Sequence, residues 1–197
     1  MTIRRRRRRE AESPAPEPRR RLGRGSTMTI GFLVVFGALA YAATVAKGGH
    51  RLIETAIDID APPAEVWAVL AETAHYPDWN PFIRRIEGEF RAEARLTVEI
   101  APPGKSPQTF RPRVLRAEPE KELRWVGSYI LPMVLEGQHL LLLEAGPAGG
   151  TRLHHAERFV GLLAAWGSAE LFDATRQGFE AMNRALKARV EARPRRA

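Results

Sequence analysis

The side chains best suited to chemistry in this sequence are two histidines and a glutamate in its last third. His139 lies in the segment 136–145, EGQHLLLLEA, and His155 and Glu157 lie in the segment 150–160, GTRLHHAERFV. Both segments alternate apolar and polar residues, as half-buried strands do, so residues of one parity point to one face. That parity places all three on the inward face with apolar neighbours: Leu141, Leu143, Leu153 and Phe159. Polar groups in an apolar interior need partners, which makes this trio the most informative feature of the chain.

Several roles are open to the trio. A histidine oriented by Glu157 is suited to act as a general base or to hydrogen-bond a bound ligand. Alternatively, a histidine–glutamate hydrogen bond across two neighbouring strands only steadies them. Two histidines and a carboxylate are zinc ligands in other proteins, but the chain has no close-spaced ligand motif such as H-E-x-x-H. We therefore name His139, His155 and Glu157 as candidate catalytic residues and expect neither a metal nor a cofactor.

Strand parity also predicts the walls of a cavity around the trio. The predicted ligand contacts are His139, His155 and Glu157 together with Val98, Phe110, Trp125, Leu141 and Trp166. Trp166 follows Leu162 and Leu163 at the start of the last predicted helix. There it would close one end of the cavity, either as a core residue or as a gate.

These residues are positioned by seven predicted strands and a long helix. Alternation predicts a first strand at 51–59, which the sequence DAPP ends just before a short helix begins. Six further strand-like segments follow with no helix between them: 82–90, 94–101, 108–117, 121–130, 136–145 and 150–160. That spacing favours an antiparallel meander. An apolar stripe at helical spacing predicts a C-terminal helix over about 164–191. The predicted fold class is α+β: a curved, seven-stranded antiparallel sheet wrapped around a long C-terminal helix, with two short helices after the first strand.

The segment HYPDWNPFI, residues 75–83, has neither a helical nor a strand period. Its two prolines limit helix to about a turn on either side. We expect it to end the second short helix and turn the chain into the second strand. Trp79 and Phe82 would pack beneath this corner, and Asn80 would bond the local backbone. A place for Tyr76 or Trp79 at the lip of a pocket is the alternative.

Four stretches together resemble the START / polyketide cyclase-like superfamily (SRPBCC), whose helix-grip fold is shared with the birch-pollen allergen. IDIDAPPAEVWAVLAE looks like the first strand and helix of that fold, and HYPDWNPFI looks like its second helix and corner. GQHLLLLE and GGTRLHHAERFVGLL look like its last two strands, running into the final helix. With ELRWVGSY the resemblance covers residues 51–191. It implies a fold but not one function, because the superfamily includes lipid carriers, cyclases, hydrolases and chaperone cofactors.

The chain preceding this domain has two parts of different composition. Residues 1–27 carry ten arginines and few apolar side chains, so we expect a disordered head. Residues 28–46, MTIGFLVVFGALAYAATVA, carry no charge and would extend roughly 28 Å as a helix, enough for a bilayer core. We expect a single-pass transmembrane helix here, with a linker at 47–50 after it and a basic tail at 192–197.

The arginines before this span predict a cytoplasmic N-terminus, with the domain on the far side of the cell membrane. A cleaved signal peptide, which would release a secreted domain, and a buried soluble helix are the alternatives. The tripeptide MTI at Met1 recurs at Met28, so the sequence leaves the start codon open.

Charge and composition exclude several other classes. The net charge is +8, but residues 28–197 hold 21 basic and 20 acidic side chains, so the domain is nearly neutral. We therefore expect no nucleic-acid partner. The chain has no cysteine, which excludes disulfides, thiolate metal sites and a cysteine nucleophile. Nothing in the sequence indicates an oligomeric state.

Three functions fit these observations. The first is a noncatalytic carrier or sensor of an apolar small molecule, such as a lipid, isoprenoid or polyketide-like compound, held between sheet and helix at a membrane. The second is a cyclase or dehydratase that uses His139, His155 and Glu157 as its acid–base set. The third is an interaction module of an envelope complex with a vestigial cavity. We favour the carrier, because it requires the fewest specific roles of individual side chains.

Overall fold

The computed structural model describes residues 36–39, 42, 49–129, 134–166 and 169–193. Residues 36–39 and Ala42 are helical. No helix built from the described residues is long and apolar enough to cross a membrane. The arginine-rich head, most of the predicted span at 28–46, residues 47–48 of the predicted linker and residues 194–197 lie outside the described residues. The expectations for those segments therefore stay predictions.

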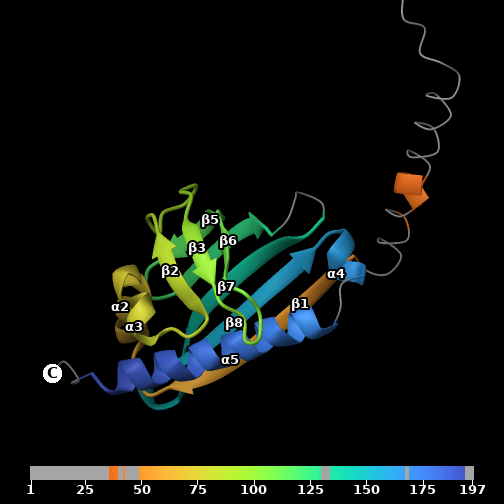
Figure 1. The fold of residues 1–197 in the computed structure, drawn as a ribbon. Coiled ribbons are helices and arrows are strands. Elements are labelled where there is room, and N and C mark those ends of the chain that lie inside the picture. Colours follow the sequence, from red (N-terminus) through yellow and green to blue (C-terminus); the bar gives the residue numbers. More distant parts are fainter. Residues whose placement is uncertain (1–35, 40–41, 43–48, 130–133, 167–168, 194–197) are drawn as a thin grey trace, which may run out of the picture. The chain divides into compact units, whose positions relative to one another are not determined.

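The domain contains two antiparallel sheets, and their strands come from the alternating segments of the sequence (Figure 1). The larger sheet has the order β1-β8-β7-β6-β5, with β1 (His50–Ile59), β5 (Arg113–Glu118), β6 (Glu122–Ser128), β7 (Glu136–Ala145) and β8 (Thr151–Val160). The smaller has the order β2-β3-β4, with β2 (Ile83–Glu87), β3 (Thr97–Ile100) and β4 (Gln108–Phe110). β1 pairs with β8 along its whole length, so the first and last strands of the domain are neighbours.

This arrangement corrects the prediction of one seven-stranded sheet: the described residues form eight strands in two sheets. The predicted strand 108–117 is two strands, β4 and β5. Pro112 lies between them and lacks the N–H that a strand ladder needs. The sheets are still bonded to each other here, because Leu96 N donates to Pro112 O and Val114 N to Ala94 O, each at 2.9 Å.

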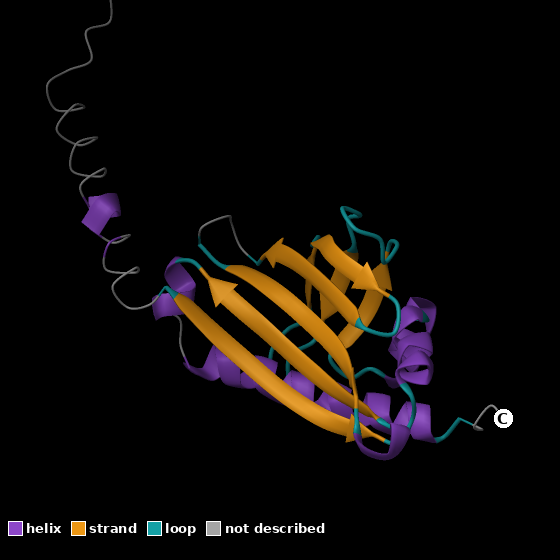
Figure 2. Cartoon of the chain, turned by 180° about the vertical axis from the view of Figure 1, so that it is seen from behind, coloured by secondary structure: helices purple, strands orange, loops and turns teal. Residues whose placement is uncertain are grey.

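The helices lie against the larger sheet and at its ends. They are α2 (Pro63–Ala71), α3 (Tyr76–Trp79), α4 (Leu162–Trp166) and α5 (Ala169–Glu191), with short 3₁₀ turns η1 (Thr73–His75) and η2 (Pro147–Gly149). α5 runs along one face of the sheet, with α2 and α3 at one end of it and α4 at the other (Figures 1 and 2). The predicted long helix is therefore seen as α4 and α5, with residues 167–168 outside the described residues.

The buried side of α5 packs closely on the corner after α3. Its buried residues follow the helical period of the sequence: Phe172, Ala174, Thr175, Gly178, Phe179, Met182, Asn183, Leu186 and Val190. A Cβ at Gly178 would lie only 2.6 Å from Phe82 Cε2, so the glycine is what lets Phe82 reach the helix. Phe82 also meets the ring of Phe179 edge-on, with centroids 5.4 Å apart.

The corner HYPDWNPFI has the predicted structural role. Asn80 Oδ1 accepts hydrogen bonds from the backbone N–H groups of Phe82, at 3.0 Å, and of Ile83, at 2.9 Å. Tyr76 is buried and donates its hydroxyl to Leu70 O at 2.8 Å. Trp79 is half-buried and packs edge-on against Tyr76. Tyr76 is thus a core residue, and Asn80 directs the chain into β2.

Candidate functional site

Strands β7 and β8 carry the histidine–glutamate trio to the face that α5 covers. In their register His139 lies opposite Glu157, and Leu141 lies opposite His155. His139 is 3% exposed, His155 0% and Glu157 2%. The inward orientation predicted from parity is confirmed. Three further residues bond the trio, and we call the six together the interior polar cluster: Thr55, Tyr129, His139, His155, Glu157 and Asn183.

Glu157 is held by a tyrosine and a histidine. The Tyr129 hydroxyl donates to Glu157 Oε1 at 2.6 Å, and His139 Nδ1 lies 3.5 Å from Glu157 Oε2. Burial, with the charge of Glu157 beside it, raises the pKa of Tyr129 well above 10, so the phenol keeps its proton and remains a donor. Gly137 makes room for the pair, because a Cβ there would overlap Glu157 Oε1.

His155 is held by a relay from helix to sheet. Its Nδ1 lies 2.8 Å from Asn183 Oδ1 on α5. Asn183 Nδ2 donates to Thr55 Oγ1 at 2.9 Å, and the Thr55 hydroxyl donates to the carbonyl oxygen of His155 at 3.2 Å. Burial lowers the pKa of His155 well below 6.5, and the neighbouring His139 lowers it further, while the bond to Asn183 opposes them. The imidazole is therefore neutral at pH 7.

Both histidines lie in a stack of rings between β6 and α5. Trp125 stacks on His139 with centroids 4.5 Å apart and planes 5° apart. His155 stacks on Phe179 at 3.8 Å and 15°, and the two histidines meet edge-on at 4.8 Å. The Nε2 atoms of His139 and His155 are buried and have no hydrogen-bond partner among the residues that the structure describes. The stack thus closes the site from solvent and leaves two polar atoms unsatisfied within it.

The remaining predicted contacts differ in their surroundings. Val98 and Leu141 are buried in the core. Phe110 is half-buried and its ring lies 5.0 Å from that of Tyr129. Trp166 belongs to α4, but its side chain lies outside the described parts of the chain, so its role stays a prediction. Among the described residues, no group of three or more metal-ligating side chains is placed to hold an ion.

Sequence reasoning missed Tyr129 and Asn183. Tyr129 has the same parity as Trp125 at the end of the predicted strand 121–130, which was a usable signal for its inward position. Asn183 interrupts the apolar stripe of α5 next to Met182, and a polar residue in such a stripe is a signal for a buried hydrogen bond. Its partner, however, lies 28 residues away, and only the fold reveals it.

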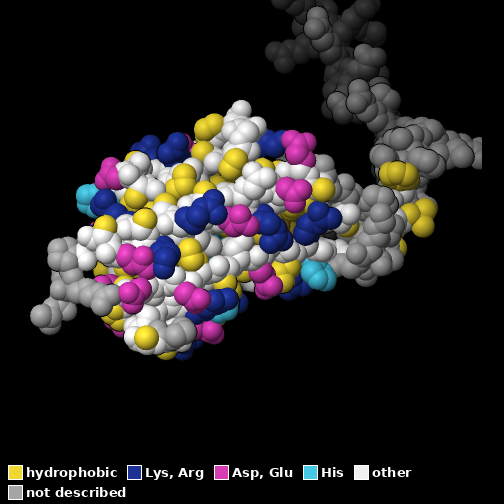
Figure 3. Space-filling model, turned by 90° about the horizontal axis from the view of Figure 1, so that it is seen from below, with side chains coloured by type: hydrophobic (Ala, Val, Ile, Leu, Met, Phe, Trp, Pro, Cys, Tyr) yellow, Lys and Arg dark blue, Asp and Glu magenta, His cyan; other side chains and the backbone are white. Residues whose placement is uncertain are grey.

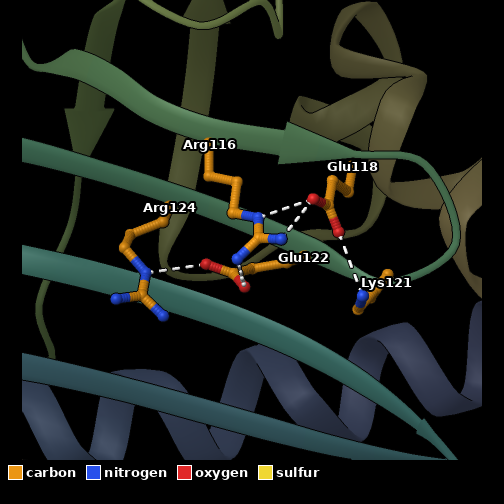
Figure 4. Close-up of polar contacts among 5 residues, drawn as sticks. All are labelled: Arg116, Glu118, Lys121, Glu122 and Arg124. Carbon is orange, nitrogen blue, oxygen red and sulfur yellow. Dashed lines mark hydrogen bonds and ion pairs between the residues drawn. The ribbon is translucent and has the colours of Figure 1, made fainter.

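A second polar cluster lies outside the interior, on the β5–β6 hairpin (Figure 4). Glu122 is only 4% exposed. Its carboxylate lies 2.7 Å from Arg124 Nε and 3.4 Å from Arg116 Nη1. Arg116 also bonds Glu118, which Lys121 approaches to 3.3 Å. Hydrogen bonding from Arg116 lowers the pKa of Glu118. Because both carboxylates lie beside basic side chains, this network secures the hairpin.

The outer surface offers a further hollow over β1, β7 and β8, whose lining includes Leu140, Leu142 and His154. His154 points outward as predicted, with Nε2 3.0 Å from Glu144 Oε2. Elsewhere, the face seen in Figure 3 carries basic and acidic side chains interspersed. Thr55 also lines the hollow over β1, β7 and β8, and it is the one member of the interior polar cluster that does.

A family model described as polyketide cyclase / dehydrase and lipid transport matches residues 50–191. Among solved structures, the Zhui aromatase/cyclase from Streptomyces sp. R1128 is similar with a TM-score of 0.60 and 20% identity, over 74% of this chain and 96% of that one. Ara h 8.0201 is similar with a TM-score of 0.59 and 17% identity, over 74% of this chain and 100% of that one.

Norcoclaurine synthase from Thalictrum flavum, solved in complex with dopamine and hydroxybenzaldehyde, has a TM-score of 0.56 and 13% identity, over 77% of this chain and 94% of that one. No curated protein sequence is significantly similar to the chain. At these identities the likenesses show a shared fold, and the fold alone does not decide between binding and catalysis.

Proposed function

Because the chain belongs to the family of polyketide cyclases, dehydrases and lipid-transport proteins, we propose that it binds an apolar small molecule between the larger sheet and α5. The molecule would be a lipid, an isoprenoid or a polyketide-like compound. In this proposal the protein carries or senses the molecule and does not transform it. Residues 28–46 would tether the domain to the cell membrane, with the N-terminus cytoplasmic, and so keep it close to a source of apolar molecules.

The observation that carries the proposal is the pair of unpartnered imidazole nitrogens in the ring stack. His139 Nε2 and His155 Nε2 are both buried, and no described residue bonds either of them. Leaving a buried polar atom unbonded costs about 1–3 kcal/mol. A molecule with a polar group against these nitrogens and an apolar body against Trp125 and Phe179 would offset that cost. Since the rings now contact each other, uptake requires them to separate.

The second candidate function is a cyclase or dehydratase that uses His139, His155 and Glu157. The neutral, buried imidazole of His155 favours it, because a neutral imidazole is able to accept a proton from a substrate. Against it, Glu157 is engaged by Tyr129 and His139, and His155 is fixed by Asn183. Unchanged turnover after both histidines are replaced by alanine would remove them from any mechanism.

The proposal is tested by native mass spectrometry of the gently purified full chain, followed by solvent extraction. We expect an apolar compound to co-purify. Leu141→Phe enlarges a buried side chain in the ring-lined interior and should reduce its occupancy, whereas Leu140→Phe makes the same change on the outer face of β7 and should not. Circular dichroism checks that both variants fold. A wild-type chain that never carries a compound would contradict the proposal and favour an interaction module.

A further inference from the structure

The Thr55 hydroxyl determines which groups donate and which accept in the chain of hydrogen bonds from Thr55 through Asn183 to His155. A hydroxyl has one proton to donate and two lone pairs to accept with. Thr55 Oγ1 lies 3.2 Å from the carbonyl oxygen of His155, which only accepts, so its proton is used there. Toward Asn183, 2.9 Å away, the hydroxyl is then left as an acceptor.

This sets the orientation of the Asn183 amide. The group facing Thr55 must be the NH₂ group, because a carbonyl oxygen there would meet a lone pair. The amide oxygen then faces His155 Nδ1 at 2.8 Å. An amide oxygen only accepts, so the imidazole carries its proton on Nδ1.

The Nε2 atom of His155 therefore presents a lone pair and no proton. Burial keeps the ring neutral by lowering its pKa, so no second proton is bound at pH 7. The atom is buried and has no hydrogen-bond partner within the described parts of the chain. His139 is arranged in the same sense, since its Nδ1 faces Glu157 Oε2 at 3.5 Å and its unpartnered nitrogen is also Nε2.

We propose that the interior site selects apolar molecules that donate a hydrogen bond, such as phenols and alcohols, over ethers and ketones of the same shape. This inference rests on the proposed function and adds the chemical class of its ligand. Thr55 and Asn183 act as specificity-determining residues, because they hold the acceptor nitrogen of His155 toward the ring stack. A ligand hydroxyl satisfies that nitrogen, whereas an ether oxygen would place one lone pair against another.

Two probes with one ring system test the inference on the full chain in lipid nanodiscs, with empty nanodiscs as the blank. We expect isothermal titration calorimetry to show 2-naphthol binding about tenfold or more tightly than 2-methoxynaphthalene. His155→Phe keeps a ring against Phe179 but removes one of the two acceptor nitrogens, so the preference should fall severalfold. His154→Phe, on the outer face of β8, is the matched control and should leave the preference unchanged.

The outcomes separate this inference from the function on which it rests. Equal binding of both probes to the wild-type chain would overturn donor selection while leaving the proposed function in place. Binding of neither probe would count against both. If His155→Phe does not fold, ¹⁵N NMR of the wild-type histidines decides, because a protonated Nε2 on His155 overturns the inference and a protonated Nδ1 supports it.

Discussion

Two glycines that lie opposite each other on β6 and β7 leave space for different neighbours. Gly127 pairs with Gly137 in the strand register, and a Cβ at either position would make close contacts, though of very different severity. A Cβ at Gly137 would overlap Glu157 Oε1 and lie 2.6 Å from Tyr129 Cε2. A Cβ at Gly127 would lie 3.2 Å from Pro112 Cβ, a contact that a small shift relieves. The same substitution at the two positions should therefore have very different costs.

The cost at Gly137 has two parts. Overpacking a core typically costs about 1–3 kcal/mol. Moving Glu157 also breaks its hydrogen bond to Tyr129, and a buried polar group left unbonded costs a further 1–3 kcal/mol or so. Replacing glycine stiffens the unfolded chain and returns about 0.4–1 kcal/mol at either position. We thus expect Gly137→Ala to lose about 1–5 kcal/mol of unfolding free energy, centred at about 3 kcal/mol, and Gly127→Ala to stay within about 1 kcal/mol of the wild type.

Urea unfolding followed by tryptophan fluorescence and far-ultraviolet circular dichroism measures both variants. At about 2–4 °C per kcal/mol, Gly137→Ala should also melt several degrees below Gly127→Ala. Unfolding free energies of the two variants within about 0.5 kcal/mol of each other would refute the argument that Gly137 makes room for the Tyr129–Glu157 pair.

Three further predictions follow from the packing and the pKa shifts. Asn80→Ala leaves two backbone N–H groups unbonded and should cost about 1–3 kcal/mol of unfolding free energy in urea. Asp78→Ala, at an exposed position in the same corner, should cost little, and equal losses in the two variants would contradict the role of Asn80. Gly178→Ala should displace Phe82 and cost about 1–3 kcal/mol of unfolding free energy, whereas Gln177→Ala at the neighbouring exposed position should cost little. If Gly178→Ala lost no stability, Phe82 would be shown to move aside at little cost. Because the pKa of His155 is lower in the folded than in the unfolded chain, the unfolded chain binds the extra proton, so stability should fall by up to about 1.4 kcal/mol per pH unit as the pH drops below about 6.5. The wild type and His155→Phe should differ in that slope in unfolding measurements from pH 7 to pH 5, and identical slopes would contradict the assignment.

The positions of the interior residues were predictable because they depend on a period of two. His139, His155 and Glu157 occupy regular strands buried on one face, where parity alone decides the direction of a side chain. The corner at Asn80 was likewise predictable, since its prolines and its amide act on adjacent residues. The number of strands was not, because the alternation continues through Pro112 while its hydrogen-bond ladder does not.

The partners of the interior residues could not be derived from the sequence. The relay to His155 joins Thr55, 100 residues earlier, and Asn183, 28 residues later. Tyr129 lies 28 residues from Glu157. Such contacts depend on how α5 crosses the sheet and on the β1–β8 pairing, which local patterns do not specify. The tautomer of His155, and with it the expected ligand class, therefore required the structure.

In the proposed function, the ligand lies between the larger sheet and α5, against the ring stack. A crystal structure of the full chain with its co-purified compound tests this most directly. We expect the compound beside Trp125 and Phe179, with a hydroxyl within hydrogen-bond distance of His155 Nε2. A compound bound instead in the outer hollow by Leu142, with the stack of Trp125, His139, His155 and Phe179 unchanged, would contradict it.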